Sequence, residues 1–135
     1  MSGSVVVTEN GMGRYQQEVI VGQHRLIADE PENVGGEDKG PDPFEYVMAG
    51  LGACTSMTIR MYAERKKLAL TGIHVELNHQ KIDIDGIKRD QIKRSITLQG
   101  VLSTEEQQRL LEIANMCPVH RALSNAFIID SALSN

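Results

Sequence analysis

The 135-residue sequence contains no tryptophan, and aromatic residues make up only 4% of the chain. Because large aromatic side chains are so scarce, the hydrophobic core must be built from Val, Ile, Leu, Met and Ala. The sequence also lacks a basic stripe, since Asp and Glu outnumber Lys and Arg by 18 to 14 and the formal net charge is −4. A nucleic-acid-binding protein needs a concentrated positive surface. The charge balance therefore argues against that class.

Long hydrophobic runs are missing as well. The uncharged stretch at residues 46–59 (YVMAGLGACTSMTI) has fourteen residues, whereas a helix that crosses a membrane needs about 20 apolar residues. The N-terminus has neither the basic region nor the apolar segment of a signal peptide. We therefore expect a cytoplasmic protein without membrane contacts. A chain of this length fits one domain over residues 1–135.

Cysteine is rare, and Cys54 and Cys117 are the only two. In the reducing cytosol, two cysteines are more often catalytic or metal-binding than a permanent disulfide. Cys54 lies within the uncharged stretch, so we expect it to be buried in a helix. Cys117 directly precedes Pro118, so we expect it at the start of a short helix. A sheltered sulfur and a more mobile partner are what a redox pair requires.

The residue pattern predicts an α+β fold, with antiparallel sheet around a long buried helix. Expected strands cover residues 5–8, 15–21, 24–29, 73–79, 91–99 and 127–129; expected helices cover 43–67, a segment after Ser103, and 119–123. Asp42 and Pro43 suit the start of the long helix. Its first two-thirds carry almost no charge, so neighbours must cover it on every side. Gly50 and Gly52 permit a close helix crossing there, which a dimer would explain.

The two cysteines have different expected surroundings. The helical neighbours of Cys54 are all uncharged (Val47, Gly50, Leu51, Met57, Thr58 and Met61), and burial among them raises a thiol pKa. A reactive Cys54 therefore requires a cation from elsewhere in the fold, and a structural buried cysteine is the alternative. Cys117 is expected at a helix N-cap, where free backbone N–H groups lower the thiol pKa. There the alternative is a small residue that merely separates two helices.

A metal site is a further alternative, because Cys117 and His120 have a Cys-x-x-His spacing and Cys54 would be a third ligand. Zinc sites usually draw on more cysteines or on paired motifs. Three of the four histidines (His24, His74 and His79) lie on expected strands. We therefore expect no metal.

Two motifs together carry a family resemblance. The segment GPDPFE at 40–45 leads into GACT at 52–55, and CPVHRAL follows at 117–123. With HRLIADEP at 24–31, the sequence resembles an OsmC-like branch of the OsmC/Ohr family, the osmotically inducible protein C and organic hydroperoxide resistance proteins. The resemblance implies an intertwined homodimer with its thiols at the subunit boundary. It also implies a thiol peroxidase that needs no metal or organic cofactor.

The resemblance further implies roles for individual residues. Cys54 would attack an organic hydroperoxide and become a sulfenic acid, and Cys117 would condense with it to a disulfide that a lipoyl-type dithiol reduces. The family pairs a glutamate with an arginine beside the reactive thiolate; here these would be Glu45 and Arg25, with Arg14 as the second choice. Nine residues on one continuous helix place Glu45 and Cys54 on opposite faces. Either the helix begins after Glu45, or Glu45 serves the partner subunit.

A non-enzymatic reading competes with the peroxidase. In that reading the chain is an OsmC-like dimer that binds a small apolar ligand, and its cysteines are structural or only slowly oxidised. The apolar residues around Cys54 (Val47, Leu51, Met57 and Met61) suit either an organic hydroperoxide or such a ligand.

Overall fold

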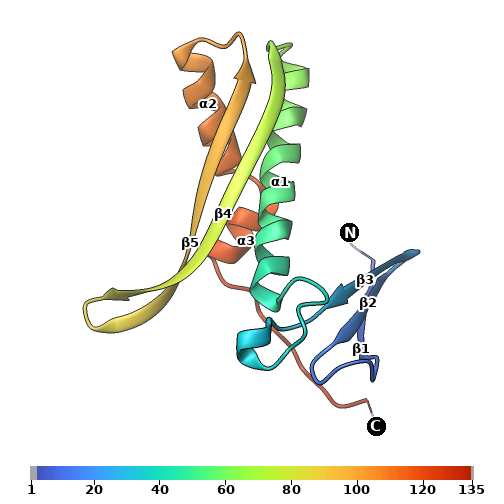
Figure 1. Cartoon of the computed structure of the whole chain (residues 1–135). Coiled ribbons are helices and arrows are strands. Elements are labelled where there is room, and N and C mark those ends of the chain that lie inside the picture. Colours follow the sequence, from blue (N-terminus) through green and yellow to red (C-terminus); the bar gives the residue numbers. More distant parts are fainter. Residues whose placement is uncertain (1–2, 135) are drawn as a thin grey trace. The chain divides into compact units, whose positions relative to one another are not determined.

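The computed structural model describes residues 3–134. Its contacts divide the chain into two compact units, one up to Val47 and one from Met48 onward, and each is described by itself. The elements are β1 (Val5–Glu9), β2 (Gln17–Val21), β3 (His24–Ala28), the 3-10 helix η1 (Glu32–Val34), α1 (Pro43–Arg65), β4 (Leu70–Ile84), β5 (Ile87–Gly100), α2 (Thr104–Ala114) and α3 (Pro118–Ser124) (Figure 1). The expected α+β class with antiparallel sheets is confirmed.

The first unit contains a three-stranded antiparallel sheet with β2 in the centre. Gly22 has a φ of 58°, which glycine adopts without strain, and this permits the expected tight turn between β2 and β3. The loop after β3 is organised by the buried Asp29. Its carboxylate accepts backbone N–H bonds from Glu30 (2.8 Å), Glu37 (3.2 Å) and Lys39 (3.1 Å). The loop is therefore tied to the end of β3.

Helix α1 begins at Pro43, as expected. The Asp42 carboxylate accepts the N–H of Glu45 (2.9 Å), and the Glu45 carboxylate accepts the N–H of Asp42 (2.8 Å). These reciprocal bonds satisfy two backbone donors that a helix start leaves free. The alternative in which the helix begins after Glu45 is therefore wrong, because Glu45 lies in the first turn.

The second unit is built on a two-stranded antiparallel ribbon of β4 and β5, with α1 and α2 beside it (Figure 1). Residues directly opposite each other in such a pair share one face. Five buried residues from α1, β4 and α2 form the core cluster: Ile59, Ala63, Leu70, Leu110 and Ala114. Helix α2 begins with the expected capping box between Ser103 and Glu106.

The structure corrects two expectations about this unit. The predicted strand at 127–129 is wrong: the chain after α3 contains no strand as far as residue 134, and its apolar side chains are exposed. A strand needs a neighbouring strand for its backbone hydrogen bonds, and the chain brings none to it. The complete covering of α1 is also wrong within one chain. Its buried residues form a single stripe, whereas Met57 and Met61 on another face are 60% and 67% exposed.

None of the helices within residues 3–134 is long and apolar enough to cross a membrane.

Candidate active site

Cys54 lies in the middle of α1, beside the buried stripe of that helix. The next residue, Thr55, is fully buried, whereas Cys54 itself is half-buried. The Cys54 Sγ lies 3.9 Å from the Thr58 Oγ1 one turn further along the helix. Cys54 is therefore the more accessible of the two thiols, which reverses the expected arrangement.

Cys117 lies at the junction of α2 and α3. It has an extended backbone and is the N-cap of α3, as predicted, and its Sγ accepts the N–H of His120 at 3.3 Å. The Cys117 side chain is fully buried. The expectation of a sulfur at the open start of a helix is therefore only half right: the cap position is confirmed, but it is closed to solvent.

The pKa of Cys117 is raised, and the prediction of an easily ionised Cys117 thiol is wrong. Burial is the main cause of the rise. The Cys54 thiol raises the pKa further, whereas the His120 N–H and the Thr55 hydroxyl lower it. Burial penalises the thiolate more than these donors stabilise it. The same interactions bring the two cysteines together, since the free thiols of Cys54 and Cys117 are close enough to affect each other.

Arg94 of β5 is a cation at this site that the sequence analysis missed. Its Nη1 donates to the Thr55 Oγ1 at 3.0 Å and approaches the Ala114 carbonyl at 3.5 Å, and its Nη2 donates to the Asn115 Oδ1 at 2.7 Å. Thr55 directly follows Cys54, and Asn115 lies two residues before Cys117. Arg94 therefore contacts a near neighbour of each cysteine.

The alternation of β5 contained a signal for Arg94. Successive strand residues point to opposite faces, and Arg94 has the same parity as the apolar Ile92, Ile96 and Leu98. In the structure Arg94 pairs with Leu77, and Ile96 and Leu98 of the same face pack against the core cluster. A charged residue in an apolar row faces the covered side of a ribbon, and this marks it as a functional candidate.

His120 lies near Arg94 in the same unit. Burial lowers the pKa of its imidazole, and the Arg94 charge lowers that pKa further. The ring is therefore neutral near pH 7. His120 bonds the Cys117 sulfur through its backbone N–H.

The other residues predicted for the site lie in the first unit. Arg25 of β3 is exposed and forms an ion pair with Glu18 of β2. The Arg14 guanidinium lies 5.0 Å from the centre of the Tyr15 ring. Glu45 takes part in the start of α1. The roles of Arg25, Arg14 and Glu45 beside Cys54 stay predictions.

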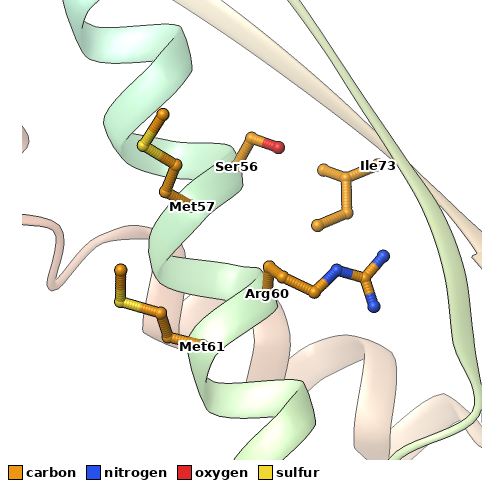
Figure 2. Close-up of a pocket in the computed structure, with 5 residues that line it drawn as sticks. All are labelled: Ser56, Met57, Arg60, Met61 and Ile73. Carbon is orange, nitrogen blue, oxygen red and sulfur yellow. The ribbon is translucent and has the colours of Figure 1, made fainter.

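An open hollow of about 400 Å³ lies along α1 in the second unit, lined by Ser56, Met57, Arg60, Met61 and Ile73. Figure 2 shows Ser56 and Arg60 pointing toward β4, whereas Met57 and Met61 lie on the other side of the helix. Arg60 donates to the Leu70 carbonyl at 2.8 Å. Met57, Met61 and Ile73 make the lining of the hollow mainly apolar, and the Arg60 guanidinium is the cation in that lining. Within residues 3–134 no three His, Cys, Asp or Glu side chains are grouped to hold a metal ion, so the zinc alternative finds no ligand set there.

Comparisons with known proteins agree with this architecture. An OsmC like protein from Mycoplasma pneumoniae is 19% identical, with a TM-score of 0.76 over 92% of this chain and 88% of that one. An organic hydroperoxide resistance protein OsmC from Legionella pneumophila is 21% identical, with a TM-score of 0.67 over 89% and 88%. The organic hydroperoxide resistance protein OhrB of Bacillus subtilis is 18% identical, with a TM-score of 0.64 over 90% of both chains.

Because these identities are low, the likeness to the three structures shows a common fold only. No functionally curated protein matches the chain significantly. The family model described as OsmC-like protein matches residues 36–131, a range that includes both cysteines, Arg94 and all of the second unit's helices and strands. The chain therefore belongs to the OsmC-like protein family.

Proposed function

We propose that the chain is a thiol-dependent peroxidase that reduces organic hydroperoxides, with Cys54 as the peroxidatic cysteine and Cys117 as the resolving cysteine. The observation that carries the proposal is the interaction of two free thiols, one half-buried and one fully buried. Two structures of the same fold come from organic hydroperoxide resistance proteins, which supports this choice of substrate. A cytoplasmic location, where thiols are kept reduced, is part of the proposal.

In the first step the Cys54 thiolate attacks the terminal oxygen of the hydroperoxide. An S–O bond forms, the O–O bond breaks, and the alkoxide takes a proton and leaves as the alcohol, so that Cys54 becomes a sulfenic acid. The half-buried position of Cys54 supports this order of attack. Cys117 is a poor first nucleophile, because it is buried and its raised pKa keeps it protonated.

In the second step Cys117 loses its proton and attacks the Cys54 sulfur. The S–S bond forms, the S–O bond breaks, and the hydroxyl leaves with the proton as water. A lipoyl-type dithiol then returns both cysteines to thiols and is itself oxidised to a disulfide. Each cycle consumes one hydroperoxide and one dithiol, with no metal or organic cofactor.

The proposal includes a homodimer. The exposed Met57 and Met61 and the open space around Gly50 support a partner subunit on that face of α1, since exposed apolar surface of this kind marks association. Glu45 would then act in the partner's site, and Arg25 would be the cation that stabilises the Cys54 thiolate. Both roles come from the family resemblance.

A second candidate function is non-enzymatic binding of a small apolar ligand. The hollow along α1 favours it, because Met57, Met61 and Ile73 give it a largely apolar lining. The cysteines do not line this hollow. Under this alternative, neither thiol is needed for the ligand to bind.

The experiment that separates the two functions measures hydroperoxide turnover. The reduced protein is mixed with cumene hydroperoxide and dihydrolipoamide, and the same assay is run on Cys54→Ser and Cys117→Ser. We expect turnover by the parent protein only. Cys117→Ser should still consume one equivalent and hold Cys54 as a sulfenic acid that dimedone traps. Equal, background-level consumption by all three proteins would contradict the peroxidase and leave the ligand-binding function.

A further inference from the structure

The guanidinium of Arg94 bridges two segments that are far apart in the sequence. Its Nη1 donates to the Thr55 Oγ1 on α1 at 3.0 Å, and its Nη2 donates to the Asn115 Oδ1 at 2.7 Å. Thr55 directly follows Cys54, and residues 115–117, which we call the α2–α3 turn, connect α2 to α3. The planar head of arginine presents several donors in fixed directions. Arg94 therefore ties the α2–α3 turn to the part of α1 that carries Cys54.

The acceptor on α1 is itself held by a second bond. The Thr55 hydroxyl donates its one proton to the Leu51 carbonyl at 2.7 Å, so the hydroxyl oxygen keeps lone pairs for the Arg94 guanidinium. Thr55 is fully buried. A hydrogen bond from a charged donor is strong, and it is stronger still where water is excluded. The Thr55 end of the bridge is therefore firmly placed.

The other end of the bridge lies at the C-terminus of α2. The last turn of α2 contains no basic residue, although the free carbonyls at a helix C-terminus favour a cation. Arg94 of β5 supplies one, and its Nη1 approaches the Ala114 carbonyl at 3.5 Å. The same carbonyl accepts the backbone N–H of Cys117 at 3.3 Å. One carbonyl group thus separates the guanidinium from the backbone of Cys117.

Cys117 is fixed within the α2–α3 turn. Its N–H bonds the Ala114 carbonyl, its Sγ accepts the His120 N–H at 3.3 Å, and its carbonyl accepts the Arg121 N–H at 3.1 Å. The Cys117 side chain is also fully buried. When the turn shifts along α1, the Cys117 sulfur therefore shifts with it.

Apolar packing also holds α2 near α1, but it does not by itself set the register between them. Ala114 belongs to the same core cluster as Ile59 and Ala63 of α1, and the attraction between apolar groups is non-directional. Hydrogen bonds require set distances and angles. The Arg94 bridge therefore adds the directional contact that packing lacks.

We propose that Arg94 is a positioning residue that sets the register of the α2–α3 turn against α1 and so holds Cys117 in place to pair with Cys54. The inference rests on the proposed function and deepens it, because the second step requires Cys117 to attack the Cys54 sulfur. A disulfide forms without strain only when the two side chains meet a narrow geometry. The bridge preserves that geometry through the catalytic cycle.

The sign of the effect on the disulfide separates positioning from a simple charge effect. If Arg94 holds the cysteines in register, its loss lowers the effective concentration of one thiol at the other, and the disulfide becomes less stable. If Arg94 instead acts by stabilising a thiolate, its loss disfavours the reduced form, and the disulfide becomes more stable. The two mechanisms therefore predict opposite shifts.

The test measures the equilibrium of the Cys54–Cys117 disulfide with glutathione. The protein is equilibrated in mixtures of oxidised and reduced glutathione, quenched with acid and alkylated, and its disulfide fraction is read by mass spectrometry. Each protein disulfide that forms converts one oxidised glutathione into two glutathione thiols, which take up the two protons of the cysteines. Because no peroxide is present, the readout does not depend on turnover.

Two variants break the bridge at different points. Arg94→Met removes the guanidinium and keeps much of the apolar stem, whereas Asn115→Ala removes one acceptor and keeps the charge of Arg94. Arg89→Gln is the charge control, because Arg89 is exposed on the same strand. Ile59→Val is the stability control, because it shortens a fully buried side chain of the core cluster.

Arg94→Met should lower the equilibrium constant for the disulfide about tenfold, which shifts the reduction potential by about 30 mV, and Asn115→Ala should lower it about threefold. Arg89→Gln and Ile59→Val should leave it unchanged, because a uniform loss of stability does not alter an equilibrium within the folded state. The proposal is overturned if Arg94→Met matches Arg89→Gln or makes the disulfide more stable. If Arg94→Met does not fold, an unchanged constant in Asn115→Ala overturns it.

The outcome is separable from that of the proposed function, because turnover of cumene hydroperoxide is measured on the same preparations. The predicted shifts in a chain without turnover would refute the peroxidase and keep the positioning role of Arg94. Turnover by the parent protein, with the same disulfide equilibrium in Arg94→Met, would refute the positioning role and keep the peroxidase. A parent protein that forms no disulfide in any of these mixtures would overturn both.

Discussion

Replacing Arg94 with methionine should lower the free energy of unfolding by about 2 kcal/mol. Methionine keeps much of the apolar stem of the side chain and loses the hydrogen bonds of the guanidinium. The 3.0 Å bond to the buried Thr55 Oγ1 accounts for most of the loss, since a bond to a charged group contributes about 1.5–3 kcal/mol. The 2.7 Å bond to Asn115 is exposed, so water replaces it cheaply, and the 3.5 Å approach to the Ala114 carbonyl is at the limit of a hydrogen bond.

The assay is urea denaturation followed by circular dichroism, with Arg89→Gln as the control. All samples are compared at one protein concentration, because the stability of a dimer depends on it. Arg89→Gln should stay within about 0.5 kcal/mol of the parent, as exposed substitutions usually do. An Arg94→Met protein as stable as Arg89→Gln would refute the reasoning, because the three bonds would then contribute nothing.

Two further predictions concern pH and assembly. Because the pKa of Cys117 is raised in the folded chain, its contribution to stability is fully present below the pKa of an unfolded thiol, about 8.5, and is lost as the pH rises through the folded value. Cys117→Ser should therefore reduce the fall of the free energy of unfolding, measured in urea, as the pH rises into the alkaline range. An unchanged slope of that free energy against pH would contradict the raised pKa. Gly50 has open space around it within one chain, so Gly50→Leu should keep the fold but yield a monomer by light scattering, whereas Gly50→Ala should stay a dimer. A dimeric Gly50→Leu protein would exclude a close crossing of α1 helices.

Local signals in the sequence predicted most of the elements. Asp42 before Pro43 and Ser103 before Glu106 mark two helix starts that the structure confirms. The cap position of Cys117 was likewise readable from Pro118, because proline fits the first turn of a helix. These features depend on residues that are close together in the chain, which is why a single sequence reveals them.

Burial and long-range pairing were not readable in the same way. The N-cap of Cys117 predicted a lowered pKa, but the Cys117 side chain is fully buried, and desolvation outweighs the cap. Arg94 lies 40 residues after Cys54 along the chain, counted from their numbers, and it reaches Thr55 through a tertiary contact between β5 and α1. The segment at 127–129 had strand-forming residues, but strand formation also depends on a neighbour.

The central claim is that Cys54 and Cys117 form a peroxide-driven pair, and the most direct test is disulfide mapping. The reduced protein is treated with one equivalent of cumene hydroperoxide, alkylated under denaturing conditions, and digested for mass spectrometry. We predict one cross-linked peptide pair that contains Cys54 and Cys117, with no free thiol left. Recovery of both cysteines as alkylated free thiols would contradict the claim.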